Sequence, residues 1–354
     1  MDSLTQAVLG AAVGHAAAGK ALGRRAAVWG AVAGTLPDLD VLAYPFLDPV
    51  GELRFHRGLT HGLAFGLVGG PALGWLAQRL ARWRGSPRGA PDALRPWLAL
   101  WTLGLVTHPL LDVLTVYGTQ LLAPFSDRPL AVASVFIIDP LVTVPILVGL
   151  VAALARQRPR WAAVGLAVAL VYLGWGVGAQ AHVRGTVAQA YAQRGVAPAR
   201  TLVAAGPLTT LWWRGIAEVD GRVEPFSVHL LDPPEDVVFE APLRFADLPT
   251  PVAASRAGQT LDWFSRGWLV RTAAEGHVLA VADPRFGRLG TGPEAPFVFT
   301  WSLPTEPPVM FEQRPIAAPP AGVLRQALGQ IRLRRAGPSP DPGRTPANTA
   351  APAP

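Results

Sequence analysis

Cysteine is absent from all 354 residues of the chain, and this absence limits the chemistry available to the protein. Without a thiol there is no thiolate metal ligand, no cysteine nucleophile and no disulfide bond. The first residues also lack the basic cluster of a secretory signal, and the first apolar stretch keeps the polar side chains of Gln6 and His15. We therefore expect no cleavable signal peptide.

Apolar residues, in contrast, are abundant and unevenly distributed. Hydrophobic residues make up 50% of the chain, and the mean hydropathy is +0.30. Residues 1–181 consist mostly of long Ala, Leu, Val and Gly runs, whereas residues 182–354 have the composition of a soluble protein. The sequence therefore predicts an α-helical polytopic membrane domain over 1–181, followed by a smaller, mainly β soluble domain over 182–335. Residues 336–354, rich in Pro and Ala, predict a disordered tail.

Basic residues exceed acidic ones and give the chain a net charge of +7. In a soluble protein such a surplus would suggest a nucleic-acid partner. In the membrane half, however, most of the surplus lies in short loops between apolar segments, where the positive-inside rule accounts for it. We therefore expect membrane lipids, and no nucleic acid, as partners.

Six apolar segments account for the membrane half, at about 4–19, 26–43, 62–78, 97–116, 132–154 and 161–181. A helix needs about 20 residues to cross the ~30 Å hydrocarbon core, a length that the last three segments reach and the second and third nearly reach. The first segment is rich in Gly and Ala, which favours a helix packed closely among the others. Whether this first helix crosses the bilayer stays open.

The basic residues of the loops predict the orientation of the helices. Eleven follow the first, third and fifth segments: Lys20, Arg24, Arg25, Arg79, Arg82, Arg84, Arg88, Arg95, Arg156, Arg158 and Arg160. Three follow the second and fourth segments: Arg54, Arg57 and Arg128. By the positive-inside rule the first set is cytoplasmic, so six crossings place both the N-terminus and the C-terminal domain outside the plasma membrane.

The C-terminal half begins with a helical continuation over 182–194 and then changes to short alternating stretches. Turn signals such as Asp220-Gly221 and Asp232-Pro233-Pro234 separate these stretches. Alternation bounded by turns predicts strands, here at about 209–213, 226–231, 268–272, 277–282 and 297–303.

Ionisable residues of the membrane half gather in a few short motifs at one end of the predicted helices. They are Asp38 and Asp40 in Thr35-Leu-Pro-Asp-Leu-Asp40, His56 and His61 in His56-Arg-Gly-Leu-Thr-His61, and His108 and Asp112 in Thr107-His-Pro-Leu-Leu-Asp112. Three further candidates lie on the same side: Asp2, Arg57 and Asp139. Charged groups in membrane spans are costly and normally mark function, and the predicted topology places this whole set near the outer face.

The spacing and chemistry of these residues are typical of a metal site. His108 and Asp112 are four residues apart and project from one face of a helix. Asp38 and Asp40 cannot share a helical face, so they fit only where the helix unwinds at its end. Imidazole and carboxylate ligands suit Zn²⁺, Mn²⁺ or Fe²⁺, and the sequence does not choose among these ions.

Each of these signals also has a purely structural interpretation. His108 and Asp112 alone could form a helix–helix hydrogen bond, and Asp139, which precedes Pro140, could cap a helix. Arg57 could pair with a carboxylate or bind an anionic substrate. The joint occurrence of the motifs on one side of the membrane is what favours a metal site.

The same motifs resemble the YdjM-like family of inner-membrane proteins. The resemblance rests on Asp-Ser-Leu-Thr-Gln at 2–6, Pro-Asp-Leu-Asp at 37–40, His-Arg-Gly-Leu-Thr-His-Gly at 56–62, the His108 and Asp112 pair, and Phe136-Ile-Ile-Asp-Pro140. In the soluble half it extends to Trp212-Trp-Arg214, Phe264-Ser-Arg-Gly267 and Asp283-Pro-Arg-Phe-Gly287. It implies a multi-pass inner-membrane protein with metal-dependent hydrolase activity. The first motif of the family usually ends in His, where this chain has Gln6.

Two functions follow as hypotheses. The first is a membrane-embedded metal-dependent hydrolase with Asp38, Asp40, His56, His61, His108 and Asp112 as metal ligands. Asp40 and Asp112 would take catalytic roles, and a site near the lipid headgroups suggests a lipid or lipid-linked ester or phosphoester as substrate. The second is a non-enzymatic membrane protein, either a metal transporter or a scaffold with a structural metal.

Overall fold

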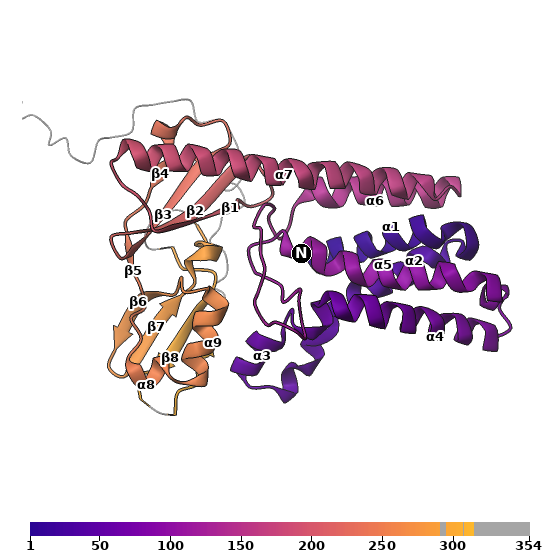
Figure 1. Cartoon of the computed structure of the whole chain (residues 1–354), viewed down its shortest axis with the longest axis horizontal. Coiled ribbons are helices and arrows are strands. Elements are labelled where there is room, and N and C mark those ends of the chain that lie inside the picture. Colours follow the sequence, from indigo (N-terminus) through magenta and orange to yellow (C-terminus); the bar gives the residue numbers. More distant parts are fainter. Residues whose placement is uncertain (291–294, 307, 315–354) are drawn as a thin grey trace, which may run out of the picture.

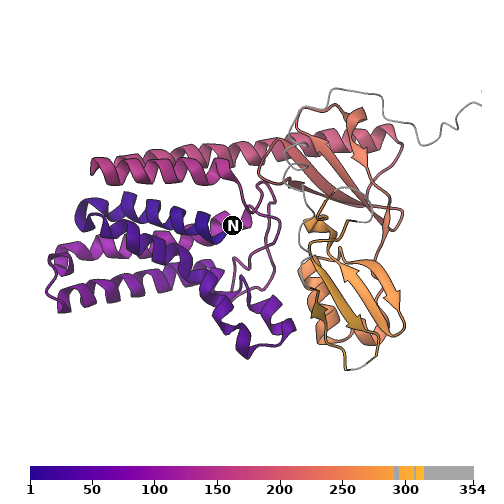
Figure 2. The same cartoon turned by 180° about the vertical axis from the view of Figure 1, so that it is seen from behind.

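A helical region is followed by a β region in the computed structural model, which describes residues 1–290, 295–306 and 308–314. Figures 1 and 2 show a helical bundle at one end of the molecule, two sheets at the other, and helix α7 running along both. This arrangement confirms the expected order of a helical half and a mainly β half. The predicted disordered tail, 336–354, lies outside the described residues.

The helical region begins at α1, whose first turn is capped by Asp2. Its elements in chain order are α1 (Ser3–Leu22), α2 (Arg25–Thr35), the 3-10 helix η1 (Leu36–Phe46), α3 (Pro49–Phe55), η2 (Leu59–His61), the π-helical turn η3 (Phe65–Gly69), α4 (Gly70–Trp83), η4 (Pro87–Gly89), η5 (Pro91–Ala93), α5 (Leu94–Val113), α6 (Pro140–Arg156) and α7 (Arg160–Gln193).

The six apolar segments of the sequence correspond to α1, α2 with η1, η3 with α4, α5, α6 and α7. The fifth segment was expected to begin at 132, but α6 begins only at Pro140, because Asp139 caps it and Pro fits the first helical position. Helix α7 runs unbroken to Gln193, so the expected domain boundary at 181 falls inside one helix.

Within the described residues, two helical stretches are long and apolar enough to cross a membrane, Arg25–Phe46 and Arg160–Gln193, and Pro140–Arg156 is a shorter apolar helix. The outer surfaces of α6 and α7 are also apolar: Val151 is 56% exposed, Leu170 70% and Val171 74%. Large exposed apolar patches are rare on soluble monomers, and these exposed side chains suit contact with lipid. Crossing by all six segments stays a prediction.

Close contact between α1 and α2 organises the bundle. A Cβ atom on Gly10 would lie 2.3 Å from the carbonyl oxygen of Gly30, and one on Gly14 would lie 2.7 Å from the Cα of Gly30. Gly10 and Gly14, like Gly30 and Gly34, are four residues apart, so each helix presents a small-residue stripe to the other. Helix α1 also contacts α5, α6 and α7, so it lies inside the bundle.

The β region forms two antiparallel sheets. The first has the order β1-β2-β3-β4 with β5 paired to β3, and the second has the order β6-β7-β8-β9. The strands are β1 (Arg200–Ala205), β2 (Trp212–Val219), β3 (Arg222–His229), β4 (Val238–Phe239), β5 (Leu243–Arg244), β6 (Val270–Glu275), β7 (Val278–Ala282), β8 (Thr300–Pro304) and β9 (Glu312–Gln313). Short helices complete the region: η6 (Pro234–Asp236), α8 (Thr250–Ala253), α9 (Arg256–Ser265) and η7 (Pro284–Phe286).

Each sheet shares a hydrophobic core with a helix of the helical half. The last turns of α7 contribute Val183, Val187 and Tyr191 to a core shared with Trp213 and Phe226 of the first sheet. The second sheet packs on α9, and the same core includes residues of α3, which follows η1 in the helical half. The β region is therefore attached to one end of the bundle at two places.

The close approach of α1 and α2 generates a stability prediction. Gly10→Ala should lower the free energy of unfolding by about 1–3 kcal/mol, because the added methyl group overlaps the backbone of α2 and forces the helices apart. Thermal denaturation of the detergent-solubilised protein measures the change.

Gly174→Ala in α7 is the matched control, since a Cβ atom there meets nothing within 4 Å. This control should leave the protein as stable or stabilise it by up to about 1 kcal/mol, because Ala is the better helix former. Equal destabilisation by both substitutions would contradict the packing role of Gly10.

Candidate metal centre

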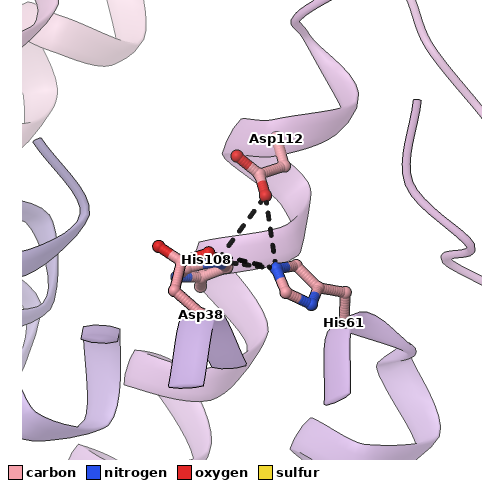
Figure 3. A group of neighbouring side chains, drawn as sticks. All are labelled: Asp38, His61, His108 and Asp112. Carbon is pink, nitrogen blue, oxygen red and sulfur yellow. Dashed lines mark hydrogen bonds and ion pairs between the residues drawn. The ribbon is translucent and has the colours of Figure 1, made fainter. Parts of the chain in front are cut away.

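Four of the predicted ligands converge at the end of the bundle that faces the β region. Asp38 comes from η1, His61 from η2, and His108 and Asp112 come from neighbouring turns of α5 (Figure 3). Pro37 lies at the start of η1, where the α-helical segment tightens into a 3-10 helix. This change of helix type turns Asp38 toward α5, as the expected unwinding of the segment required.

The ligand atoms of these four residues form a compact group, all within 4.8 Å of one another. The Nε2 atoms of His61 and His108 are 3.1 Å apart. Asp38 Oδ1 is 3.4 Å from each Nε2 atom, and Asp112 Oδ2 is 3.5 Å from each. Donor atoms bonded at about 2.0–2.1 Å to one tetrahedral ion lie about 3.3 Å apart, so the spacing fits a single small cation.

Hydrogen bonds hold the two imidazole rings with Nε2 facing the group. His108 Nδ1 lies 2.6 Å from the carbonyl oxygen of Gly34, which only accepts, so this nitrogen carries the proton and Nε2 presents its lone pair. His61 Nδ1 lies 3.1 Å from the Thr60 hydroxyl. Metal-binding histidines are commonly oriented in this way, through the nitrogen that does not bind the metal.

A carboxylate oxygen without a hydrogen-bond partner provides an independent test of the fit. Asp112 is fully buried, and its Oδ2 atom has no hydrogen-bond partner among the residues that the structure describes. A proton shared between His61 and His108 would satisfy the two rings but would leave this oxygen with only the ion pair to Arg57 Nε, at 3.4 Å. A cation between the four atoms would satisfy the oxygen and both lone pairs, so the residues present fit a divalent metal ion.

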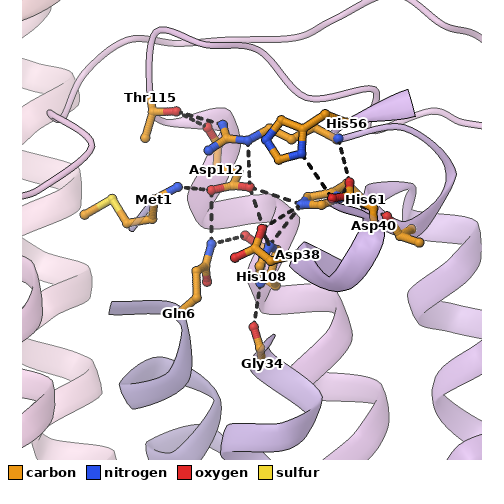
Figure 4. Close-up of polar contacts among 12 residues, drawn as sticks. Met1, Gln6, Gly34, Asp38, Asp40, His56, His61, His108, Asp112 and Thr115 are labelled. Carbon is orange, nitrogen blue, oxygen red and sulfur yellow. Dashed lines mark hydrogen bonds and ion pairs between the residues drawn. The ribbon is translucent and has the colours of Figure 1, made fainter. Parts of the chain in front are cut away.

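Asp40 and His56, also predicted as ligands, lie beside the group of four. Asp40 Oδ1 is 3.1 Å from His56 Nδ1, and Asp40 Oδ2 accepts a hydrogen bond from the backbone N–H of Arg57 at 3.0 Å (Figure 4). Asp40 Oδ2 is also 3.7 Å from His61 Nδ1, which is beyond hydrogen-bond range. Their contacts place Asp40 and His56 around the ligands, and metal binding by either one stays a prediction.

Arg57 occupies the opposite side of Asp112. Its Nε atom is 3.4 Å from Asp112 Oδ2, its NH1 group donates to Thr115 Oγ1 at 3.2 Å, and its guanidinium lies over the ring of Tyr117. The backbone of Arg57 is left-handed, with φ of 55°, a conformation that costs a non-glycine residue energy. Of the two roles weighed for Arg57, the structure shows the ion pair.

The remaining two candidates cap helices. Asp2 accepts hydrogen bonds from the backbone and the hydroxyl of Thr5 at the start of α1. Asp139 accepts from the N–H of Leu141 at 3.0 Å and from the Tyr172 hydroxyl at 2.9 Å. Asp139 therefore has the helix-cap contact of its structural interpretation, and Asp2 makes the same kind of contact.

Sequence reasoning did not find every contact of the group. Gln6, the departure from the family motif, donates through Nε2 to Asp112 Oδ1 at 3.0 Å, while its buried Oε1 has no partner in the described part of the chain. The amino group of Met1 also contacts Asp112 Oδ1. The carbonyl oxygen of Gly34 has no sequence signature, although its place on the stripe facing α1 could have indicated its fixed position.

The helical half and the His/Asp group at one end of it are the features of a helical membrane protein with a candidate metal centre. Residues 1–183 match the YdjM inner membrane protein family, and the chain belongs to this family. The chain is 32% identical over 127 residues, 35% of its length, to inner membrane protein YbcI of Escherichia coli (strain K12), of which 68% is covered. No solved structure matches the chain. These findings confirm the resemblance seen in the motifs and support an inner-membrane location.

The geometry predicts which histidines hold the metal. His61→Ala and His108→Ala should each abolish stoichiometric metal in the purified protein, because each removes one of the four clustered donor atoms. His56→Ala should keep the metal, since His56 contacts Asp40 and lies outside the four. Elemental analysis of the purified variants measures the content.

The control is His182→Ala, which removes an exposed imidazole on α7. Metal content that is unchanged in both His61→Ala and His108→Ala would show that the four residues do not form the site. Loss in His56→Ala equal to the loss in His61→Ala would instead extend the ligand set to His56.

Proposed function

We propose that the protein is a metal-dependent hydrolase of the inner membrane, with the metal held by His61, His108 and Asp112. The observation that carries this proposal is the spacing of the donor atoms, which are 3.1 to 3.5 Å from one another where measured. These three side chains are fully buried, whereas the side chain of Asp38 is 18% exposed. Catalytic sites typically have three protein ligands and keep a further position for water or substrate.

In this reaction, the metal and the carboxylates of the chain have different roles. A divalent cation supplies Lewis acidity, which polarises an ester or phosphoester and lowers the pKa of water. Asp38, at the accessible side of the group, accepts the proton that the attacking water loses. The sequence predicted catalytic roles for Asp40 and Asp112, but here Asp112 is a ligand, and the two oxygens of Asp40 already contact His56 and the Arg57 backbone. Asp40 instead positions His56 and the segment that leads to His61.

An apolar groove beside the site supports a lipid or lipid-linked substrate. The groove has a volume of about 570 Å³ and runs between η1 and the η3–α4 segment. Asp40 and Thr60 are the polar residues of its lining, and the rest is apolar: Leu36, Leu39, Ala43, Phe55, Phe65, Gly69, Ala72 and Leu73. An acyl or isoprenoid chain in this groove would bring its ester or phosphoester end to Asp40, beside the ligand group.

The proposed topology places this chemistry at the outer face of the membrane. It has six crossings, Arg-rich loops in the cytoplasm and the β region outside. The metal-site end of the bundle is the end that contacts the β region, and the Arg-rich turns around Lys20, Arg84 and Arg158 lie at the other ends of their helices. The two sets of residues are independent, and their separation agrees with the topology.

A structural metal is the second candidate, and the burial of the donors favours it. If Asp38 also binds the ion, four protein ligands close the tetrahedron, as in structural zinc sites. The protein would then be a membrane scaffold without hydrolytic activity. The two candidates differ in the role of Asp38, and that residue decides between them.

Asp38→Asn should retain metal but lose hydrolytic activity by about 100-fold or more, because an amide cannot accept the proton from water. Release of phosphate or fatty acid from phospholipid–detergent micelles measures activity, and elemental analysis of the same samples measures metal. Asp92→Asn, which removes an exposed carboxylate before α5, is the control and should change neither. A wild-type protein without hydrolytic activity, together with loss of metal in Asp38→Asn, would favour the structural candidate.

The topology is tested without reference to the chemistry. Alkaline phosphatase, which is active only outside the cytoplasm, should be active when fused at the C-terminus and inactive when inserted at Gly85, in the α4–α5 connection. A fluorescent protein that folds only in the cytoplasm should give the reverse pattern. Cytoplasmic activity at the C-terminus would overturn the proposed orientation.

A further inference from the structure

Three arginines from the soluble-half motifs meet where the two sheets and the α5–α6 loop come together. Arg214 is in β2, Arg266 ends α9 and Arg285 is in η7. A Cβ atom on Gly287 would lie 2.2 Å from Arg214 NH1, and a Cβ atom on Gly118 of the α5–α6 loop would lie 2.5 Å from Arg266 NH2. Glycine at both positions therefore leaves space for the guanidinium groups.

Arg285 is the anchor of this group, which we call the arginine junction: Arg214, Arg266 and Arg285. Its side chain is fully buried and forms an ion pair with Asp283 through Nε at 3.0 Å and NH2 at 2.5 Å. NH2 also donates to the carbonyl oxygen of Phe264 at 2.5 Å. The NH1 group is buried and has no hydrogen-bond partner among residues 1–290, 295–306 and 308–314.

Arg214 and Arg266 lack the carboxylate partner that Arg285 has. Their Nε atoms, and NH2 of Arg266, are buried without a hydrogen-bond partner in the described chain. Burial is the main cause that lowers the pKa of each guanidinium to about 10, and Asp283 opposes it for both. For Arg266, the neighbouring Arg285 and Arg128 contribute to the lowering. Both side chains are charged at neutral pH, so the junction holds positive charge that its own residues do not balance.

The backbone also favours a specific position for Arg266. This residue ends α9 in the left-handed conformation, with φ of 55°, where glycine is usual. A non-glycine residue in this conformation is strained, and such strain is found mostly where the side chain has a functional role. Here the left-handed turn directs Arg266 toward the α5–α6 loop and Gly118.

We propose that the arginine junction binds a phosphate or phosphomonoester group. Three guanidinium groups and the single carboxylate of Asp283 leave two positive charges, which match a phosphomonoester dianion at neutral pH. A guanidinium group can donate two parallel hydrogen bonds to two oxygens of one phosphate. The buried guanidinium nitrogens without a partner are donors that such a phosphate could use. Such an anion would offset the energetic cost of burying unpaired charge.

This site is separate from the metal centre, and the proposal stands without the proposed hydrolysis. Tyr117 lies between them: its ring is 4.8 Å from the Arg57 guanidinium on one side and 5.9 Å from the Phe286 ring, next to Arg285, on the other. The phosphate could come from solution or from a lipid headgroup. The shared chemistry is the anionic phosphate group.

Inorganic phosphate and phosphatidic acid in detergent micelles are the two probes. Each is titrated against the purified full-length protein at constant ionic strength, and the melting temperature is recorded. We expect phosphate or phosphatidic acid to raise the melting temperature of the wild-type protein. Arg214→Gln and Arg266→Gln should each weaken the apparent affinity about tenfold or more, because each removes charged hydrogen-bond donors. The probe that saturates at the lower concentration identifies the source of the phosphate.

Two controls separate this site from general effects and from the metal centre. Arg244→Gln removes an exposed positive charge from the same β region and should leave the response unchanged. His61→Ala should also keep the response. If either Gln variant fails to fold, Arg266→Lys tests the same point, since Lys keeps the charge but loses the two-pronged geometry.

Three outcomes would overturn the proposal. The wild-type protein could respond to neither probe, the arginine variants could respond as the wild type does, or the response could disappear in His61→Ala while it persists in the arginine variants. The last outcome would place phosphate at the metal centre.

Discussion

The contact between α1 and α2 is the constraint on which the candidate metal centre depends. A Cβ atom on Gly34, near the end of α2, would lie 2.6 Å from the carbonyl oxygen of Gln6 on α1. The carbonyl oxygen of the same Gly34 accepts the hydrogen bond from His108 Nδ1. Helix packing therefore fixes the acceptor that selects the tautomer of His108, and Asp38 follows only four residues later. A small-residue interface in the bundle thus determines which atoms can face a cation.

Electrostatics explain why the polar residues are arranged in layers around that point. The donors with the least solvent contact, His61, His108 and Asp112, lie at the centre, and Arg57 lies against Asp112. The ring of Tyr117 covers Arg57 and contacts Phe264 of α9, which belongs to the core of the second sheet. The β region therefore covers the Arg57 side of the group, which lowers the local dielectric and strengthens charge interactions there.

The sequence predicted the helical and β halves, and four of its six ligand candidates lie together. His108 and Asp112 were predictable because a four-residue spacing places both on one helical face. Asp40 and His56 were not separable from the others, because only the 3-10 conformation of η1 turns Asp40 away from Asp38 and toward His56. The contacts of Arg57 depend on a left-handed backbone that no pattern indicated. Arg214, Arg266 and Arg285 come together because the two sheets lie next to each other. The alternation of residues along a strand predicts the strand but not the arrangement of one sheet relative to another.

Helix α7 has a mechanical consequence for the whole molecule. Its 34 residues form one uninterrupted helix, about 50 Å long at the usual rise, which exceeds the thickness of the hydrocarbon core. The half beyond the bundle serves as the packing surface of the first sheet. The first sheet is thus packed on a long rigid helix, and a change in the tilt of this helix, for example in a thinner bilayer, would strain the second attachment of the β region, at α3.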